Sequence, residues 1–443
     1  MLNGYDIAYG LGIGLSAPFW LAKRSTRRKV LQAFRQRMGD HVVRQGTSPA
    51  VMIHAVSLGE LNAARALIRS LSDSRPQLQF VISTTTTTGW ARAQELYGKD
   101  PRITLIRYPL DFSSAVNAVL DRLRPELVVL MELEVWPNFV LQCRRRGIPV
   151  VLINGRLTEG SFRNYRLAGP LIRKTFRRLA AVCAQEDLYA RRFIELGVEP
   201  DRVAVTGTMK FDTAQVADHL DGADALAQAV GLRPGQEPIW VCGSTGPGEE
   251  ELILPMYRDL LATHPGLRLV LVPRKPERFD EVADLIGSQG FPLVRRSKPD
   301  VKAAGDGAPP VILGDTMGEL RKFYSLADVV FVGRTLLDLG SRQHGSDMIE
   351  PAALARPVIV GPFTGNFAEV MNCFRAADAM VEVKSPQELK TQIDRMLNDR
   401  SSATLMGERA QEVVRRQQGA TQRNLSIILE HLDRRLGSAL RRA

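Results

Sequence analysis

The sequence alternates short apolar runs with segments in which apolar residues recur every three or four positions. The apolar run at residues 51–56 predicts a buried strand, and the segment from Glu60 to Leu71 predicts an amphipathic helix. The same alternation predicts further strands at residues 78–83, 103–106, 127–131, 149–154, 180–185, 203–206, 239–242, 267–272, 311–313, 329–332 and 358–360. Because strands that alternate with helices form parallel sheets covered on both faces, we expect a doubly wound α/β fold.

A looser segment at residues 216–237 interrupts this rhythm, and 443 residues are too many for one average domain. We expect an apolar and basic anchor at 1–30, an N-terminal α/β domain at 31–215 and a linker at 216–237. A second α/β domain is expected at 238–415, followed by a basic helix at 416–443. Two Rossmann-like halves joined by a hinge describe a GT-B-like architecture, in which ligands occupy an interdomain cleft.

The net charge is +11, from 59 basic and 48 acidic residues. This charge favours an anionic partner, such as a membrane surface, a phosphorylated lipid or nucleic acid. The sequence contains no interleaved aromatic and basic motif and no zinc finger, so we expect no nucleic acid. The four cysteines and six histidines show no ligand spacing, and no metal site is expected. A P-loop is also absent, which argues against ATP hydrolysis.

Residues 7–22 form an uncharged run of 16 residues, shorter than the ~20 that span a bilayer comfortably. Five basic residues follow closely, at Lys23, Arg24, Arg27, Arg28 and Lys29. The positive-inside rule places the chain after them in the cytoplasm. The segment is therefore interpreted as a monotopic or marginally spanning anchor. The alternative is an apolar first helix that packs on the body of the protein.

Glu60 lies where a strand ends and a helix begins, at the edge where open α/β sheets bind ligands. A structural role competes with this interpretation, because Ser57-x-x-Glu60 fits a capping box. From these residues alone, both roles remain open.

The second half contains residue types suited to a nucleotide. The Gly-rich turn at 243–248 could expose backbone N–H groups to an anion, or be a simple turn. Arg274, at the end of a strand, could clamp a phosphate. Glu350 stands before a proline at a helix start, where it could accept both ribose hydroxyls or act only as an N-terminal charge. Thr316-x-x-Glu319 fits another capping box.

Eleven motifs follow one another over roughly 310 residues: HAVSLGE (54–60), STTTTTG (83–89), YPLD (108–111), MELEVWPN (131–138), NGRL (154–157), VTGTMKFD (205–212), GSTGPGEEE (243–251), LVPRKPERF (271–279), GDTMGEL (314–320), EPAAL (350–354) and GPFTGNF (361–367). By their order and spacing, the chain resembles the 3-deoxy-D-manno-octulosonic acid (Kdo) transferases. That family comprises inner-membrane glycosyltransferases that add Kdo to lipid A precursor.

The chain departs from the family pattern in three places. Residues 344–350 read HGSDMIE where the family usually has Gly-Gly-His-Asn-Pro-Leu-Glu, so ribose or base contacts there are expected to differ. MELEVWP replaces the commoner Met-Glu-Thr-Glu-Leu-Trp-Pro and keeps both carboxylates. Lys275 stands where a histidine is usual.

The resemblance implies an inverting transfer of Kdo from CMP-Kdo, without a metal or other cofactor. By family position, Glu60 matches the base that takes the acceptor proton, and its helix N-terminus is expected to favour the ionised form. Glu132 and Lys210 match transition-state groups. The structural alternatives are a Glu132 bonded to a neighbouring arginine and an ordinary solvated Lys210.

The resemblance also implies a set of CMP-binding residues in the second half. By family position these are Pro273, Arg274, Met317, Gly318, Glu319, Asp347, Met348, Ile349 and Glu350.

The partners implied are CMP-Kdo, lipid A precursor (lipid IVA) and a membrane lipid surface. The expected location is the cell inner membrane, with both domains on the cytoplasmic side. Two other classes stay open: a GT-B enzyme with another nucleotide sugar, such as a UDP-sugar transferase or 2-epimerase, and a non-catalytic protein that binds anionic lipid or nucleic acid. A degenerate enzyme is expected to lose Glu60, Lys210 or Glu350, and all three are present.

Overall fold

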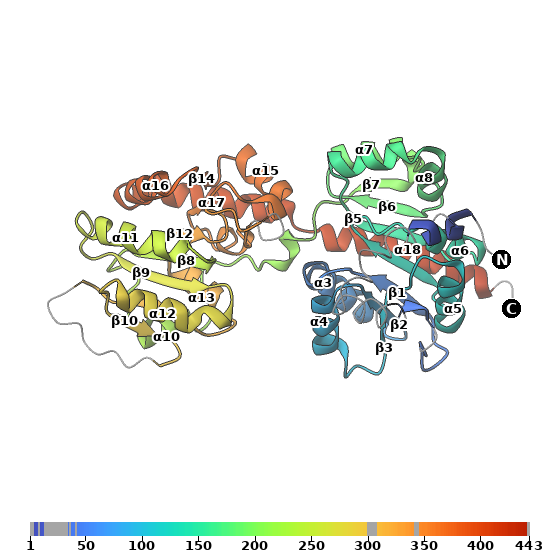
Figure 1. The fold of residues 1–443 in the computed structure, drawn as a ribbon, viewed down its shortest axis with the longest axis horizontal. Helices are drawn as coiled ribbons and strands as arrows, with labels where there is room; N and C mark the ends of the chain where they lie inside the picture. The colour runs from blue at the N-terminus through green and yellow to red at the C-terminus, as the bar shows by residue number, and fades with distance from the viewer. Residues whose placement is uncertain are drawn as a thin grey trace. The chain divides into compact units, whose positions relative to one another are not determined.

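The computed structural model describes residues 4–7, 9–12, 34, 37–39, 42–298, 308–340 and 345–440. The chain divides into two compact units, Met1–Thr213 with Gln418–Ala443, and Ala214–Gln417. Each unit contains a parallel sheet flanked by helices (Figure 1), so the expected pair of α/β domains is confirmed. The cleft expected between them stays a prediction.

The first unit is built on a seven-stranded sheet in the order β3-β2-β1-β4-β5-β6-β7. All its pairings are parallel, and its strands are β1 (Ala50–His54), β2 (Gln79–Thr84), β3 (Ile103–Arg107), β4 (Leu127–Met131), β5 (Val150–Gly155), β6 (Ala181–Ala184) and β7 (Val203–Val205). Because the chain runs outward from β1 in one direction and from β4 in the other, the order of strands reverses between them. Such a reversal creates a crevice at the carboxyl ends of the two strands.

Helices cover both faces of this sheet. They are α3 (Leu58–Ser74), α4 (Thr87–Tyr97), α5 (Ser113–Leu123), α6 (Pro137–Arg145), α7 (Glu159–Leu167), α8 (Gly169–Phe176) and α9 (Asp187–Glu195), with the short helices η1 (Pro200–Arg202) and η2 (Phe211–Thr213). Successive strand residues point to opposite faces. On β1, Ile53 therefore joins a core with α3, whereas Met52 joins a second core with α5 and α6.

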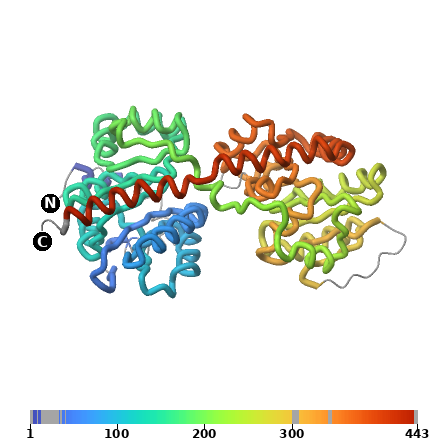
Figure 2. Tube along the Cα trace, turned by 180° about the vertical axis from the view of Figure 1, so that it is seen from behind, coloured from blue at the N-terminus to red at the C-terminus, as the bar shows by residue number. Residues whose placement is uncertain are grey.

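The last helix of the chain, α18 (Ala420–Leu440), belongs to the first unit. Leu425, Ile428 and Leu432 are buried in the same core as residues of α3. Figure 2 shows α18, in red, lying along the first unit. Asp212 fixes the start of the helix, because its carboxylate accepts the N–H groups of Gly419 and Thr421. The basic C-terminal segment is thus a structural part of the first unit.

The second unit has a seven-stranded parallel sheet in the order β10-β11-β9-β8-β12-β13-β14. Its strands are β8 (Ile239–Thr245), β9 (Arg268–Pro273), β10 (Leu293–Arg295), β11 (Val311–Leu313), β12 (Val329–Val332), β13 (Val358–Val360) and β14 (Val381–Glu382). Its helices are α10 (Ala223–Ala229), α11 (Glu249–Leu261), α12 (Phe279–Ser288), α13 (Leu320–Leu326), α14 (Ile349–Ala352), α15 (Ala368–Ala376), α16 (Pro386–Asn398) and α17 (Arg400–Gln417), with η3 (Pro276–Arg278) and η5 (Gly365–Phe367). Here the strand order reverses between β8 and β12, which places a second crevice at their carboxyl ends.

The predicted anchor at residues 7–22 lies mostly outside the described residues. Within the part that the structure describes, no helix is both long and apolar enough to cross a bilayer.

Candidate functional site

Glu60 lies at the crevice of the first sheet, in the first turn of α3 after β1. Its carboxylate accepts the Val56 N–H at 2.9 Å and the Ser57 hydroxyl at 3.0 Å, while its own N–H donates to Ser57 Oγ at 3.3 Å. The expected cap is therefore formed, with Ser57 as N-cap. A cap of this kind orients the carboxyl group, and the surrounding residues determine its pKa.

The surroundings raise the pKa of the Glu60 carboxyl to about 7. Burial is the largest cause and the negative charge of Glu132 is the second, while the hydrogen bonds from Val56 and Ser57 oppose them. The helix N-terminus was expected to favour the ionised form, but desolvation and a like charge outweigh it. A carboxyl group with a pKa near 7 is well matched to a general base at neutral pH.

Glu132 is the first residue after β4, the strand next to β1. Its φ angle is 56°, in the left-handed region that residues with side chains rarely adopt, and its N–H donates to the Ile153 carbonyl at 3.0 Å. The backbone therefore turns sharply at this point. The structure brings Glu132 and Glu60 to the same crevice.

Two further ionisable residues, His54 and Glu134, lie behind these carboxylates. The fully buried His54 ring stacks on Tyr108, and its Nδ1 is 2.8 Å from Ser83 Oγ. Its Nε2 is 3.7 Å from Glu134, whose carboxylate also accepts the Trp136 Nε1 proton at 2.8 Å. Burial lowers the pKa of His54, which favours the neutral ring. These supporting residues were not among the predicted site residues, although both lie in the quoted motifs.

Asn154, near the end of β5, holds the segment that carries Lys210 at the carboxyl edge of the first sheet. Asn154 has a φ of 51°, and its side-chain oxygen accepts the Met209 N–H at 3.1 Å. The carbonyl of Lys210 accepts the hydroxyl proton of Thr213 at 2.7 Å in η2, which packs against α3. The segment that carries Lys210 is thus fixed close to the helix that carries Glu60. Asn154 is a third supporting residue, after His54 and Glu134, that was not among the predicted site residues.

At the second crevice, Pro273 is the last residue of β9, and the Arg274 N–H donates to the Thr245 carbonyl at 3.0 Å. Glu350 lies in α14, where burial and the charge of Asp347 raise its pKa to about 7 and Arg321 and Arg274 oppose this shift. Arg274 and Asp347 are thus close enough to Glu350 to influence its pKa. Their joint role in binding a nucleotide stays a prediction.

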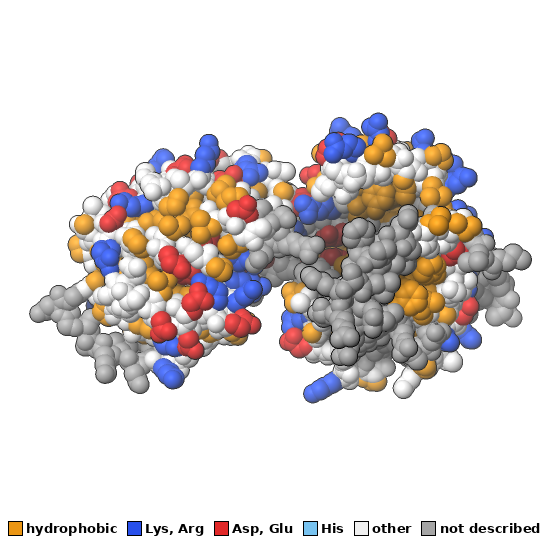
Figure 3. All heavy atoms as spheres, in the orientation of Figure 1, with side chains coloured by type: hydrophobic (Ala, Val, Ile, Leu, Met, Phe, Trp, Pro, Cys, Tyr) orange, Lys and Arg blue, Asp and Glu red, His pale blue; other side chains and the backbone are white. Residues whose placement is uncertain are grey.

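The other predicted nucleotide-binding residues differ in exposure. Met317 is exposed, and Gly318 has a φ of 87°. Met348 and Ile349 are fully buried. Glu319 pairs with Arg296 at 3.0 Å and Lys322 at 3.8 Å, and charged side chains gather over α13 in the space-filling view (Figure 3).

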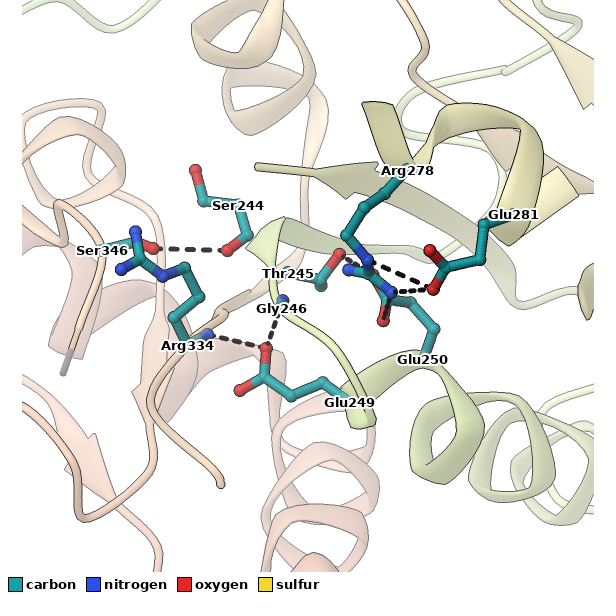
Figure 4. Close-up of polar contacts among 9 residues, drawn as sticks. All are labelled: Ser244, Thr245, Gly246, Glu249, Glu250, Arg278, Glu281, Arg334 and Ser346. Atoms are coloured by element: carbon teal, nitrogen blue, oxygen red, sulfur yellow. Dashed lines mark hydrogen bonds and ion pairs between the residues drawn. The ribbon is translucent and has the colours of Figure 1, made fainter. Parts of the chain in front are cut away.

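The Gly-rich turn at 243–248 does not present an open cradle for an anion. The buried carboxylate of Glu249 accepts the N–H groups of Gly246, Arg334, Thr335 and Leu336, at 2.7–3.1 Å (Figure 4). A Cβ atom at Gly246 would lie 2.6 Å from the Leu339 side chain. An internal carboxylate therefore occupies the Gly246 amide, which favours the simple turn among the two alternatives left open by the sequence.

Glu250, the next residue, makes a buried ion pair. Both of its oxygens lie 2.9 Å from the guanidinium of Arg278, and Oε1 also accepts the Thr245 hydroxyl at 2.6 Å (Figure 4). Together, Glu249 and Glu250 join the loops after β8, β9 and β12. Across the described ranges, no group of three or more His, Cys, Asp or Glu residues is arranged to hold a metal ion.

Two α/β units, each built on a doubly wound parallel sheet, define a GT-B-like architecture. The fold is similar to that of UDP-GlcNAc 2-epimerase from Neisseria meningitidis bound to UDP-GlcNAc, with a TM-score of 0.55 and 16% identity over 86% of this chain and 100% of that chain. MurG from Acinetobacter baumannii gives a TM-score of 0.52 and 15% identity, over 86% of this chain and 99% of that one. At these identities the likeness shows the fold alone.

The sequence comparisons are more specific. Residues 32–213 match the family model of 3-deoxy-D-manno-octulosonic-acid transferase (kdotransferase). The 3-deoxy-D-manno-octulosonic acid transferase of Haemophilus influenzae is 33% identical over 90% of this chain and 92% of its own length. The chain belongs to the Kdo transferase family of glycosyltransferases, which confirms the resemblance.

Proposed function

We propose that this protein transfers Kdo from CMP-Kdo to a hydroxyl group of lipid A precursor (lipid IVA), in lipopolysaccharide biosynthesis. The observation that carries the proposal is Glu60, a carboxyl group with a pKa of about 7 at the sheet crevice of a Kdo transferase family member. A base with this pKa is half deprotonated at neutral pH. It can therefore take up the acceptor proton there.

The reaction is a single displacement with inversion. Glu60 accepts the proton of the acceptor hydroxyl, and the oxygen of that hydroxyl forms a bond to the anomeric carbon of Kdo. The bond from this carbon to the phosphate oxygen breaks at the same time, which releases CMP. Glu132 and Lys210 stabilise the charges that develop: the carboxylate faces the oxocarbenium-like sugar and the ammonium faces the departing phosphate. No metal or other cofactor takes part in this proposal, because the donor's own carboxylate helps to stabilise the sugar cation.

The second unit binds the donor in this proposal. Arg274 binds the phosphate, and Glu350 accepts the ribose hydroxyls when it is ionised. The other contacts come from Pro273, Met317, Gly318, Glu319, Asp347, Met348 and Ile349.

The acceptor reaches the first unit from a membrane surface. Leu167 in α7 and Leu171 in α8 have exposed side chains. Each helix also carries a basic residue in its last turn, Arg166 in α7 and Arg173 in α8. Figure 3 shows apolar and basic side chains together over these helices. Such a surface suits anionic lipid headgroups. We place the protein at the cytoplasmic side of the inner membrane, anchored by residues 7–22, without a nucleic-acid partner.

The proposal is tested by incubating the full chain with CMP-Kdo and lipid IVA in detergent. The mass of the lipid product is then measured by mass spectrometry. We expect the acceptor to gain Kdo with equal release of CMP, and the yield to survive EDTA. UDP-GlcNAc is the control donor. Conversion of UDP-GlcNAc in place of CMP-Kdo would overturn the donor assignment, and loss of activity with EDTA that metal restores would overturn the metal-independent mechanism.

A further inference from the structure

Arg334 occupies a backbone position that favours glycine. It follows Gly333 at the end of β12, its φ angle is 60°, and its N–H donates to Glu249 Oε2 at 2.7 Å. Residues with side chains rarely adopt this conformation, and glycine adopts it without strain. A long cationic side chain at such a position points to a use that offsets the strain.

Arg334 and Arg274 flank the end of the same strand. In the order β9-β8-β12, Gly243 of β8 pairs with Val272 on one side and Val332 on the other. Each arginine lies two residues beyond its paired valine. Because neighbouring strands are ~4.8 Å apart, the two backbones leave the sheet about 10 Å from each other. That separation lets both side chains reach a single small ligand.

Neither guanidinium group is held in an ion pair by the described part of the chain, although Glu249 acts electrostatically on Arg334, and Arg274 on Glu350. Among the described residues, neither makes a hydrogen bond or an ion pair through its side chain. Arg334 is half-buried, and its pKa is lowered first by burial and then by the positive charge of Arg274. Two like charges in a partly desolvated site favour an anion that neutralises both.

Four backbone amides at this edge are not available to an anion. The N–H groups of Gly246 and of residues 334–336 are already bonded to Glu249. In Figure 4 the Arg334 side chain leads away from Glu249, to the side opposite the Glu250–Arg278 pair. An anion at this crevice is therefore met by arginine side chains.

The donor carries two separate negative charges, one on the phosphodiester and one on the sugar carboxylate. The positive charge of Arg274 lowers the pKa of Glu350, the residue assigned to the ribose. We therefore assign Arg274 to the nucleotide part of the site. Arg334 is the second cation, on the other side of β8. Given the proposed donor, we propose that Arg334 binds the carboxylate of the donor sugar while Arg274 binds the phosphate.

The test is Arg334→Gly, a change that suits the left-handed backbone and keeps the N–H bonded to Glu249. CMP lacks the sugar carboxylate, whereas CMP-Kdo carries it. We expect the KM for CMP-Kdo to rise roughly 10- to 100-fold, the range for a lost charge-assisted hydrogen bond. The Kd of CMP, measured by calorimetry, should stay within about twofold of the wild-type value, which also shows that the unit is folded.

Arg334→Lys should restore part of the donor affinity. Arg409→Ala, which removes an exposed positive charge from α17, is the control and should change neither value.

Two results would overturn this assignment: an unchanged KM for CMP-Kdo, or an equal loss of CMP and CMP-Kdo affinity. Equal loss would mean that Arg334 contacts the phosphate. Failure of the proposed function is a separate outcome, because wild-type protein would then not transfer Kdo at all.

Discussion

Glu60 and Glu132 follow the two neighbouring strands between which the first sheet reverses its order, and the charge of Glu132 raises the pKa of Glu60. Together with burial, this repulsion brings that pKa to about 7. The pair thus explains how a residue that caps a helix can also act as a base. The strength of the base depends on the second carboxylate.

Glu132→Gln should move the acidic limb of the pH profile of kcat/KM to lower pH. Activity rises with pH as Glu60 loses its proton, and removing the neighbouring charge makes that proton easier to lose. The measurement is kcat/KM for Kdo transfer between pH 5 and 9. The maximum rate should also fall, because Glu132 is assigned a role in the transition state. A limb that stays in place would show that the two carboxylates are not coupled.

Ser57→Ala should move the same limb to higher pH. The Ser57 hydroxyl donates a hydrogen bond to Glu60 and lowers the pKa of Glu60. Without this hydrogen bond, burial and the charge of Glu132 raise that pKa further. The variant also loses an N-cap, which costs about 1 kcal/mol of stability.

Ser385→Ala is the matched control for this variant. Ser385 caps α16 in the same way, accepting the Glu388 N–H at 3.2 Å, while Glu388 accepts the Lys384 N–H at 2.8 Å. We expect a similar loss of stability in urea unfolding and no change in the pH profile. An equal pH shift in both variants would attribute the effect to general loosening of the fold.

Glu60→Gln should make the protein more stable above pH 7. The folded-state pKa of Glu60 lies above its unfolded value, so its contribution to stability is complete below about pH 4.5 and is lost as the pH rises through about 7. Glutamine keeps hydrogen bonds to Val56 and Ser57 without this loss. Because Glu60 is only partly buried, we expect a gain on the order of 1 kcal/mol at pH 8 and little at pH 4, read from urea unfolding. A uniform loss at every pH would contradict the raised pKa.

Arg278→Met should destabilise the second unit by about 3–5 kcal/mol, because it leaves the buried carboxylate of Glu250 uncompensated. The double variant with Glu250→Met should recover much of that loss, since no unpaired charge remains. Arg375→Met is the control: Arg375 makes a more exposed pair with Glu382, for which less than about 1 kcal/mol is expected. Equal losses for Arg278→Met and Arg375→Met would contradict the role of burial.

The strands could be predicted because parallel strands buried on both faces are continuous apolar runs. The edge strands β10 and β14 were missed, since these short strands are only partly buried and do not form continuous apolar runs. The cap at Glu60 was visible in the spacing from Ser57. Its pKa was not, because burial and the charge of Glu132, a residue that follows another strand, both depend on the tertiary fold.

The role of Glu249 shows the same limit in the second unit. A glycine-rich turn before a helix resembles an anion-binding loop, and only the folded chain shows that the carboxylate of the next residue binds the Gly246 amide of the turn and the Arg334 amide after β12. Similarly, the backbone angles of Arg334 and Asn154 follow from tertiary bonds that local sequence does not encode.

The most direct test of the account is the turnover of Glu60→Gln at saturating CMP-Kdo and lipid IVA, with CMP affinity measured on the same sample. The account predicts that kcat falls by about 10²–10⁴-fold, the range for a general base, while the Kd of CMP is unchanged. Full turnover by Glu60→Gln would leave Glu60 as a helix cap and contradict its assignment as the base.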